Sequence, residues 1–126
     1  LKTPQHLTSC FLCASLDFYL EHVIGNMQPD QCTTVIRERG INHNTPCKDP
    51  ITFILANEGR VNDICSRGNG NGKQQGEPFK IVECRHDGRS KSPNCIYAGQ
   101  RYDRRIVVLK CNNREPVDLD STVQIG

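Results

Sequence analysis

Cys47-Lys48-Asp49-Pro50-Ile51-Thr52-Phe53 is the stretch of sequence from which the fold can be worked out. Proline disfavours helix in the residue before it, and the β-branched and aromatic residues at 51–55 have the composition of a strand. The stretch therefore predicts a buried strand with Lys48 anchored beside its start. A cation held there can stabilise an anionic ligand or transition state. The alternative is a surface lysine next to a structural cysteine, and the stretch by itself does not decide between the two.

Cysteine content points to an oxidising compartment. The chain has 126 residues, of which 8 are cysteine, 36% are hydrophobic and none is tryptophan. This length is typical of one domain, here residues 1–126, whose modest core gains from disulfides. We therefore expect a secreted, extracellular protein in its processed form. No apolar stretch approaches the roughly 18 to 20 residues that cross a bilayer, so no membrane span is expected.

Helical periodicity dominates the first part of the chain. It predicts a helix over residues 12–27, capped by Ser15 and stopped at Gly25. The apolar residues at helical spacing are Leu12, Leu16, Tyr19, Leu20, Val23 and Met27. Pro29 and Gly40 suit a helix start and a helix end, so a second helix is expected between them.

Strand composition dominates the second part. A strand is expected at 51–56, a short helix at 58–65 and a flexible glycine-rich loop at 68–76. Further strands are predicted at 79–84, 94–102, 105–111 and 116–123. Helices that precede strands in this way favour an α+β fold with a curved antiparallel sheet over a parallel α/β fold.

The motifs of both parts match one family in a single register. Phe18 and His22 lie four residues apart and share a helix face, and the opening heptapeptide corresponds to a Cys-Lys-x-x-Asn-Thr-Phe signature. From about Leu16 to Val123 the chain resembles the pancreatic-type ribonuclease superfamily, which includes ribonuclease A and the angiogenins. The other matching residues are Cys32, Arg37-x-Arg39-Gly40, Cys65, Cys84, Cys95-x-Tyr97, Val107-Val108, Cys111 and Pro116-Val117-x-Leu119-Asp120.

The resemblance implies a ribonuclease A-like fold, in which three helices from the N-terminal half pack on the curved sheet. It also implies the disulfides Cys32–Cys84, Cys47–Cys95 and Cys65–Cys111. Each closes a loop of roughly 50 residues, worth about 4 kcal/mol in the chain-entropy model. The glycine-rich loop at 68–76 lacks a fourth cysteine pair, which is closer to angiogenins and to fish or reptile members than to the mammalian pancreatic enzyme.

The resemblance also assigns roles to site residues. In the family one histidine takes the proton from the ribose 2′-hydroxyl, a second protonates the departing 5′-oxygen, and a lysine stabilises the charge of the phosphorane. The match places the first histidine at His22 and the lysine at Lys48, whereas Asp118 stands where the second histidine is expected. Thr52, which in the family reads the pyrimidine edge, is retained, and the resemblance also places Glu21, Ile51 and Leu119 among the base- or substrate-binding positions.

Further departures from the family pattern weaken the case for catalysis. An unperturbed aspartic acid has a pKa of about 3.9, so at pH 7 only about one molecule in a thousand could donate a proton. The glutamine expected before His22 is Glu21, and the signature asparagine is Ile51, which cannot hydrogen-bond. Losing a positioned general acid costs about 10² to 10⁴ in rate.

Three hypotheses on function follow from these departures. The first is a catalytically impaired member that acts by binding, as a receptor ligand, a small-molecule carrier or a host-defence protein. The second is a weak pyrimidine-directed endoribonuclease that uses His22 and Lys48. The third is binding of RNA, phosphate or another polyanion through Arg37, Arg39, Arg85, Arg89, Lys91, Arg101, Arg104 and Arg105.

The charge pattern favours an ordinary solvated surface over a dedicated polyanion site. The net charge is only +2, well short of the basic balance of nucleic-acid binders. Acidic residues such as Glu38 and Asp87 interrupt the basic ones. His6, His43 and His86 match no catalytic position and are expected at the surface.

Cys10 and Cys13 have no counterpart in the family pattern and lie in an N-terminal arm expected over residues 1–14. A Cys-x-x-Cys pair can be a local disulfide, a redox pair or half of a metal site. No second pair of this kind exists, so zinc is not expected, and no cofactor is implied. We expect a local Cys10–Cys13 disulfide, with a homodimer bridged through either cysteine and a redox role as the alternatives.

Overall fold

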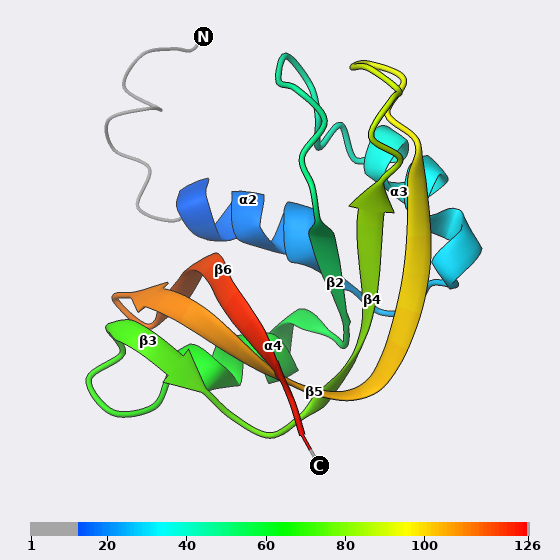
Figure 1. The fold of residues 1–126 in the computed structure, drawn as a ribbon. Coiled ribbons are helices and arrows are strands. Elements are labelled where there is room, and N and C mark those ends of the chain that lie inside the picture. Colours follow the sequence, from blue (N-terminus) through cyan, green and yellow to red (C-terminus); the bar gives the residue numbers. More distant parts are fainter. Residues whose placement is uncertain (1–12, 126) are drawn as a thin grey trace, which may run out of the picture.

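A strongly curved sheet carries the helices of this chain (Figure 1). The computed structural model describes residues 13–125. Within them the helices are α2 (Cys13–His22), α3 (Cys32–Glu38), which follows a 3-10 turn at Pro29–Gln31, and α4 (Glu58–Cys65). The strands are β1 (Val23–Ile24), β2 (Ile51–Leu55), β3 (Gly72–Gln75), β4 (Phe79–His86), β5 (Tyr97–Asn112) and β6 (Glu115–Gln124).

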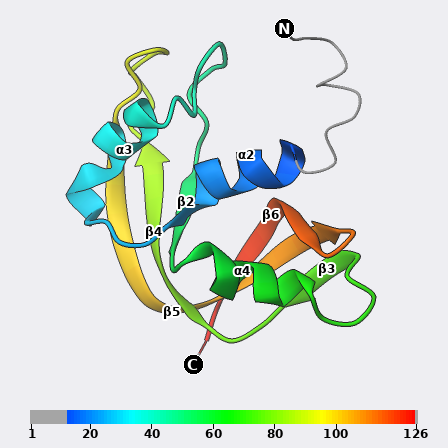
Figure 2. The same ribbon diagram turned by 180° about the vertical axis from the view of Figure 1, so that it is seen from behind.

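The long strand β5 joins two arms of the sheet. Its first half pairs with β4, and its second half pairs with β3 on one edge and with β6 on the other. β2 pairs antiparallel with β4 and parallel with the short β1. α2 lies between the two arms, and the view from behind shows α4 beside β3 (Figure 2). The predicted α+β class is confirmed, but the sheet is mixed rather than purely antiparallel.

The first helix is shorter than predicted and buries a different face. α2 ends at His22 rather than near Gly25, because the β-branched residues 23–24 pair with β2. Leu16 and Leu20, two of the apolar residues at helical spacing, are 63% and 43% exposed. Helical spacing alone therefore did not identify the buried face.

Ser15 lies inside α2 instead of capping it. Ser15 and Phe18 are the buried residues of this helix. The Ser15 hydroxyl donates a hydrogen bond of 3.0 Å to the main-chain carbonyl of Pro116, so it joins α2 to β6. Contact with a strand that lies far away in the sequence has thus selected the buried face.

The N-terminal arm is described only at its end. Cys13 and Ala14, which we expected in the arm, form the start of α2. Cys10, its expected disulfide to Cys13 and His6 lie outside the described residues, so the alternatives for this cysteine pair stay predictions.

The second and third helices follow the sequence more closely. α3 ends at Glu38, and Gly40 then adopts a φ of +66°, which glycine does without strain. α4 spans the residues predicted for it. The side chain of Asn57 caps its start by accepting a hydrogen bond from the backbone N–H of Arg60.

The strands differ from the prediction in two places. The segment 68–76 was predicted to be a loop, yet residues 72–75 form β3 and pair with β5. The two strands predicted at 94–102 and 105–111 are one strand, β5. The charged residues between them do not interrupt it, because they are exposed while the backbone pairing passes from β4 to β6.

Two hydrophobic clusters occupy the two faces of β2. Ile51 and Phe53 belong to one cluster, which also holds residues of α3, whereas Ile54 belongs to the other, with residues of α2 and α4. This division follows from the alternation of side chains along a strand. The implied disulfides Cys32–Cys84, Cys47–Cys95 and Cys65–Cys111 are all present.

Replacing Ser15 tests the bond between α2 and β6. We expect Ser15→Ala to lower the free energy of unfolding by about 1–3 kcal/mol, because the buried carbonyl of Pro116 loses its partner. Urea denaturation measures the change. Ser121→Ala is the control, since its exposed hydroxyl contacts only Asp120 and its loss should cost less than about 0.5 kcal/mol. Equal stability of the two variants would contradict the assignment.

Candidate functional site

A cavity of about 370 Å³ opens where α2 ends against β2 and β6. It is lined by His22, Pro50, Thr52, Glu83, Asp118, Leu119, Asp120, Ser121 and Thr122. Among these are four of the residues that the sequence placed in the site, namely His22, Thr52, Asp118 and Leu119. The fold therefore brings together residues that are up to about a hundred positions apart in the chain.

The ring of His22 is oriented by the backbone of β2. Its Nδ1 lies 2.9 Å from the carbonyl oxygen of Thr52, which can only accept a hydrogen bond. In the neutral ring Nδ1 therefore carries the proton and Nε2 is the acceptor. Burial lowers the pKa of His22 from its usual value, and this outweighs the opposing effects of the Thr52 carbonyl, Glu21 and Asp118. The ring is thus mostly neutral at pH 7.

Lys48 is fixed through its backbone and paired through its side chain. Its N–H donates to the side-chain oxygen of Asn42, and its carbonyl accepts a hydrogen bond of 2.6 Å from the Tyr97 hydroxyl. Its Nζ lies 2.9 Å from Oε2 of Glu21, whose Oε1 is 4.0 Å from Nε2 of His22. Lys48, the cation expected to stabilise a phosphate, is therefore held in an ion pair with Glu21. Its side chain is not part of the cavity lining.

Asp118 is exposed on β6, and its carboxylate is unpaired among the described residues. Its neighbour Asp120 lies 3.5 Å from Nζ of Lys73 and 3.9 Å from Nζ of Lys110. Within residues 13–125 the carboxylate of Asp118 itself has no ion pair or hydrogen bond. Because its negative charge raises the pKa of His22, it stands close enough to act on that ring.

Packing against the two hydrophobic clusters determines where the side chains of Ile51 and Leu119 lie. Ile51, expected among the substrate-binding residues, is 3% exposed and lies in the cluster on the opposite face of β2. Alternation along the strand turns it away from the cavity that Thr52 lines. Leu119 packs at the edge of the other cluster and reaches the cavity.

Sequence reasoning did not identify Glu83 as a residue of the site. Glu83 on β4 is the direct cross-strand partner of Thr52, which brings its carboxylate to the cavity wall. It pairs with Arg85 at 3.2 Å. Only the register between β2 and β4 reveals this contact, because no motif in the sequence links the two residues.

Several of the basic residues proposed for polyanion binding serve the fold or pair with acids. The guanidinium of Arg39 donates to the carbonyls of Leu20 and Val23 at 2.9 Å and 2.7 Å, where α2 ends. Arg101 pairs with Asp103 at 3.0 Å. The side chain of Arg105 stacks on a tyrosine ring. These contacts favour the structural and solvated interpretation of the basic residues.

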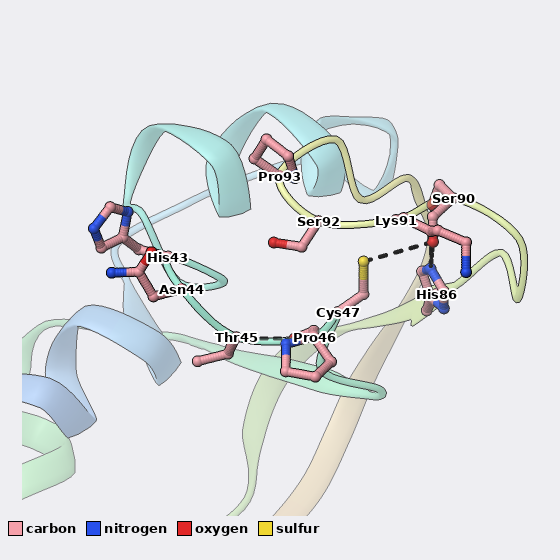
Figure 3. Close-up of a pocket in the computed structure, with 10 residues that line it drawn as sticks. All are labelled: His43, Asn44, Thr45, Pro46, Cys47, His86, Ser90, Lys91, Ser92 and Pro93. Atoms are coloured by element: carbon pink, nitrogen blue, oxygen red, sulfur yellow. Dashed lines mark hydrogen bonds between the residues drawn. The ribbon is translucent and has the colours of Figure 1, made fainter.

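A larger and more open hollow of about 840 Å³ lies elsewhere, between the loops before β2 and before β5 (Figure 3). His43 lines it on an exposed loop. His86 lines it too, but its Nε2 is hydrogen-bonded to the carbonyl of Ser90 at 2.8 Å. Size alone does not make this hollow the site, because none of the residues with assigned catalytic roles lines it.

Comparison with known proteins identifies the family. Residues 14–120 match the model of the pancreatic ribonuclease family. The chain belongs to this family. The angiogenin of Papio hamadryas is 35% identical over 115 residues, which cover 85% of this chain and 77% of the relative. The angiogenin-2 of Bos taurus is 34% identical over 94 residues, which cover 71% of this chain and 74% of the relative.

Solved ribonuclease structures confirm the ribonuclease A-like fold. RNASE ZF-3E superposes with a TM-score of 0.78 at 26% identity, covering 89% of this chain and 98% of its own. Zebrafish RNase5 superposes with a TM-score of 0.76 at 27% identity, covering 95% and 99%. The fold inferred from the cysteine pattern and the heptapeptide is therefore the fold of the family.

The described residues of this ribonuclease-family chain contain neither a candidate membrane-spanning helix nor a candidate metal-binding cluster. No helix within residues 13–125 is long and apolar enough to span a bilayer. No cluster of three metal-binding side chains occurs in the same part of the chain.

The lowered pKa of His22 has a consequence for stability. In the unfolded chain the pKa returns to about 6.5, so in mild acid the unfolded state binds a proton that the folded state does not. The free energy of unfolding should therefore fall as pH drops from 7 to 5. We expect His22→Gln to flatten this part of the profile, measured by urea denaturation at several pH values. An unchanged slope would contradict the burial of a neutral ring.

Proposed function

We propose that this member of the ribonuclease A superfamily is secreted, has impaired or lost RNA cleavage, and acts mainly by binding. The observation that carries the proposal is the carboxylate of Asp118 in the place where the family has its proton donor. An ionised carboxylate cannot protonate a leaving oxygen, and it repels the phosphate on which the reaction takes place. No imidazole other than that of His22 lines this cavity within residues 13–125.

The ion pair of Lys48 supports the same proposal. In the family the lysine faces the developing charge of the phosphorane, and here its ammonium group is 2.9 Å from Glu21. A phosphate would have to compete with that carboxylate for the lysine and would meet the second negative charge of Asp118. Both substitutions therefore weaken the binding of an anion at the same place.

The role we propose is that of a receptor ligand, a carrier or a host-defence protein. The disulfide framework is kept, which suits an oxidising extracellular environment. The cavity is kept as well, with Thr52 in its wall. A scaffold that keeps its cavity while its catalytic groups change is suited to recognition rather than turnover.

One observation favours the second candidate, a weak pyrimidine-directed endoribonuclease. The hydrogen bond from Nδ1 of His22 to the Thr52 carbonyl leaves Nε2 as an acceptor, which is the state that a general base requires. This candidate requires that Lys48 leave its ion pair with Glu21 to reach the phosphate. This candidate predicts slow cleavage that is abolished by His22→Gln.

Cleavage of a cytidine- or uridine-containing dinucleotide tests the proposal. We expect the natural chain to give cleavage at the buffer background, and Asp118→His to raise the rate by about 10² to 10⁴, the usual contribution of a positioned general acid. Adding Glu21→Gln to Asp118→His should raise it further by freeing Lys48. Release of the nucleoside product, followed by chromatography, measures the rates.

The matched control is Glu77→Gln, which removes an exposed carboxylate that pairs with Arg60 and does not line the cavity. It should leave the background rate unchanged. Cleavage by the natural chain well above background and lost in His22→Gln would reject the proposal in favour of the weak enzyme. No gain in Asp118→His would show that the missing proton donor is not what limits cleavage.

A further inference from the structure

The hydroxyl of Thr52 is a buried polar group without a hydrogen-bond partner among residues 13–125. The buried polar residues of the described chain are Ser15, Asn42 and Thr52. The side chains of Ser15 and Asn42 make hydrogen bonds. Thr52 is only 7% exposed, lines the cavity, and its Oγ1 has no hydrogen-bond partner within residues 13–125. Buried hydroxyls are normally satisfied, so this one indicates a ligand that completes it.

The charges around Thr52 favour a cation over an anion. Glu83 and Asp120, which line the cavity, each have a basic partner outside it. Asp118 has none among the described residues. Among residues 13–125 no lysine or arginine lines the cavity, and the burial that lowers the pKa of His22 keeps this ring mostly neutral at pH 7. An entering anion would therefore meet an unpaired carboxylate with no cation in the cavity wall to offset it.

The remaining wall of the cavity suits a flat group. Pro50 and Leu119 contribute apolar surface to the lining of the same cavity. A volume of about 370 Å³ holds one small ring with its substituent. Hydrogen-bonding groups at one edge of such a ring could reach both the Thr52 hydroxyl and the Asp118 carboxylate.

We infer that this cavity binds a small planar organic cation, such as an amidinium or a protonated aromatic amine, through the carboxylate of Asp118 and the hydroxyl of Thr52. The inference rests on the proposed function, because a cavity that still served phosphate transfer would require an anion there. It goes further in naming the chemical class of the ligand and the two groups that select it.

Benzamidine, benzamide and benzoate separate charge from shape, since they share a planar ring and carry +1, 0 and −1. Isothermal titration of each into the natural chain, with amide chemical shifts of Thr52 and Asp118 as the readout of location, tests the inference. We expect benzamidine to bind most tightly and benzoate most weakly. Binding of benzoate as tight as that of benzamidine would overturn the inference.

Two variants locate the selecting groups. Asp118→Asn should weaken benzamidine binding by about tenfold or more and benzamide binding hardly at all, because only the cation loses a charged partner. Thr52→Val, which keeps the shape of the side chain, should weaken the binding of both benzamidine and benzamide by a few-fold. Asp103→Asn removes an exposed carboxylate on β5 outside the cavity and should change nothing. Unchanged benzamidine affinity in Asp118→Asn would overturn the inference.

The same samples are assayed for dinucleotide cleavage, so that the two proposals fail separately. Background cleavage without a preference for benzamidine would reject the cation site and leave the proposed function standing. Substantial cleavage together with a clear preference for benzamidine would reject the proposed function while the measured charge selectivity stands. Asp118 is exposed, so Asp118→Asn should fold, and circular dichroism of each variant verifies this before titration.

Discussion

The alternation of side chains along β2 is the constraint on which the site depends. Phe53 and Ile54 are both fully buried, and they enter different hydrophobic clusters on opposite faces of the strand. A shift of one residue in the pairing with β4 would exchange these faces and turn Thr52 toward the cluster that Phe53 now fills. The burial of this pair therefore determines that Thr52 lines the cavity and that Ile51 points away from it.

A second constraint is the way α2 is held at both ends. The Ser15 hydroxyl ties its first turns to β6, and Arg39 satisfies carbonyls where the helix stops. The ring of His22, in the last turn, is then bonded to the backbone of β2. Because each bond reaches a different part of the chain, the position of the imidazole depends on the whole fold rather than on the helix alone.

The two proposals share one physical cause, which is the negative charge of Glu21 and Asp118 at and beside the cavity. Glu21 forms an ion pair with Lys48. Asp118 has no ion pair within the described residues, and the nearby ring of His22 is mostly neutral at pH 7. The hydrophobic clusters and the disulfides do not depend on these charges. The scaffold can therefore stay the same while the preferred ligand changes from an anion to a cation.

The amino-acid sequence by itself determined the class of fold, the cysteine pairing by family resemblance, the helix α4 and four of the nine residues that line the cavity. Those features follow from local composition or from the register of a motif, which a single chain carries in full. Only the tertiary structure decided which face of α2 is buried, that Arg39 serves the end of a helix, and that Glu83 lies opposite Thr52. The physical reason is that each of these contacts joins segments far apart in the chain, so no local pattern of residues encodes it.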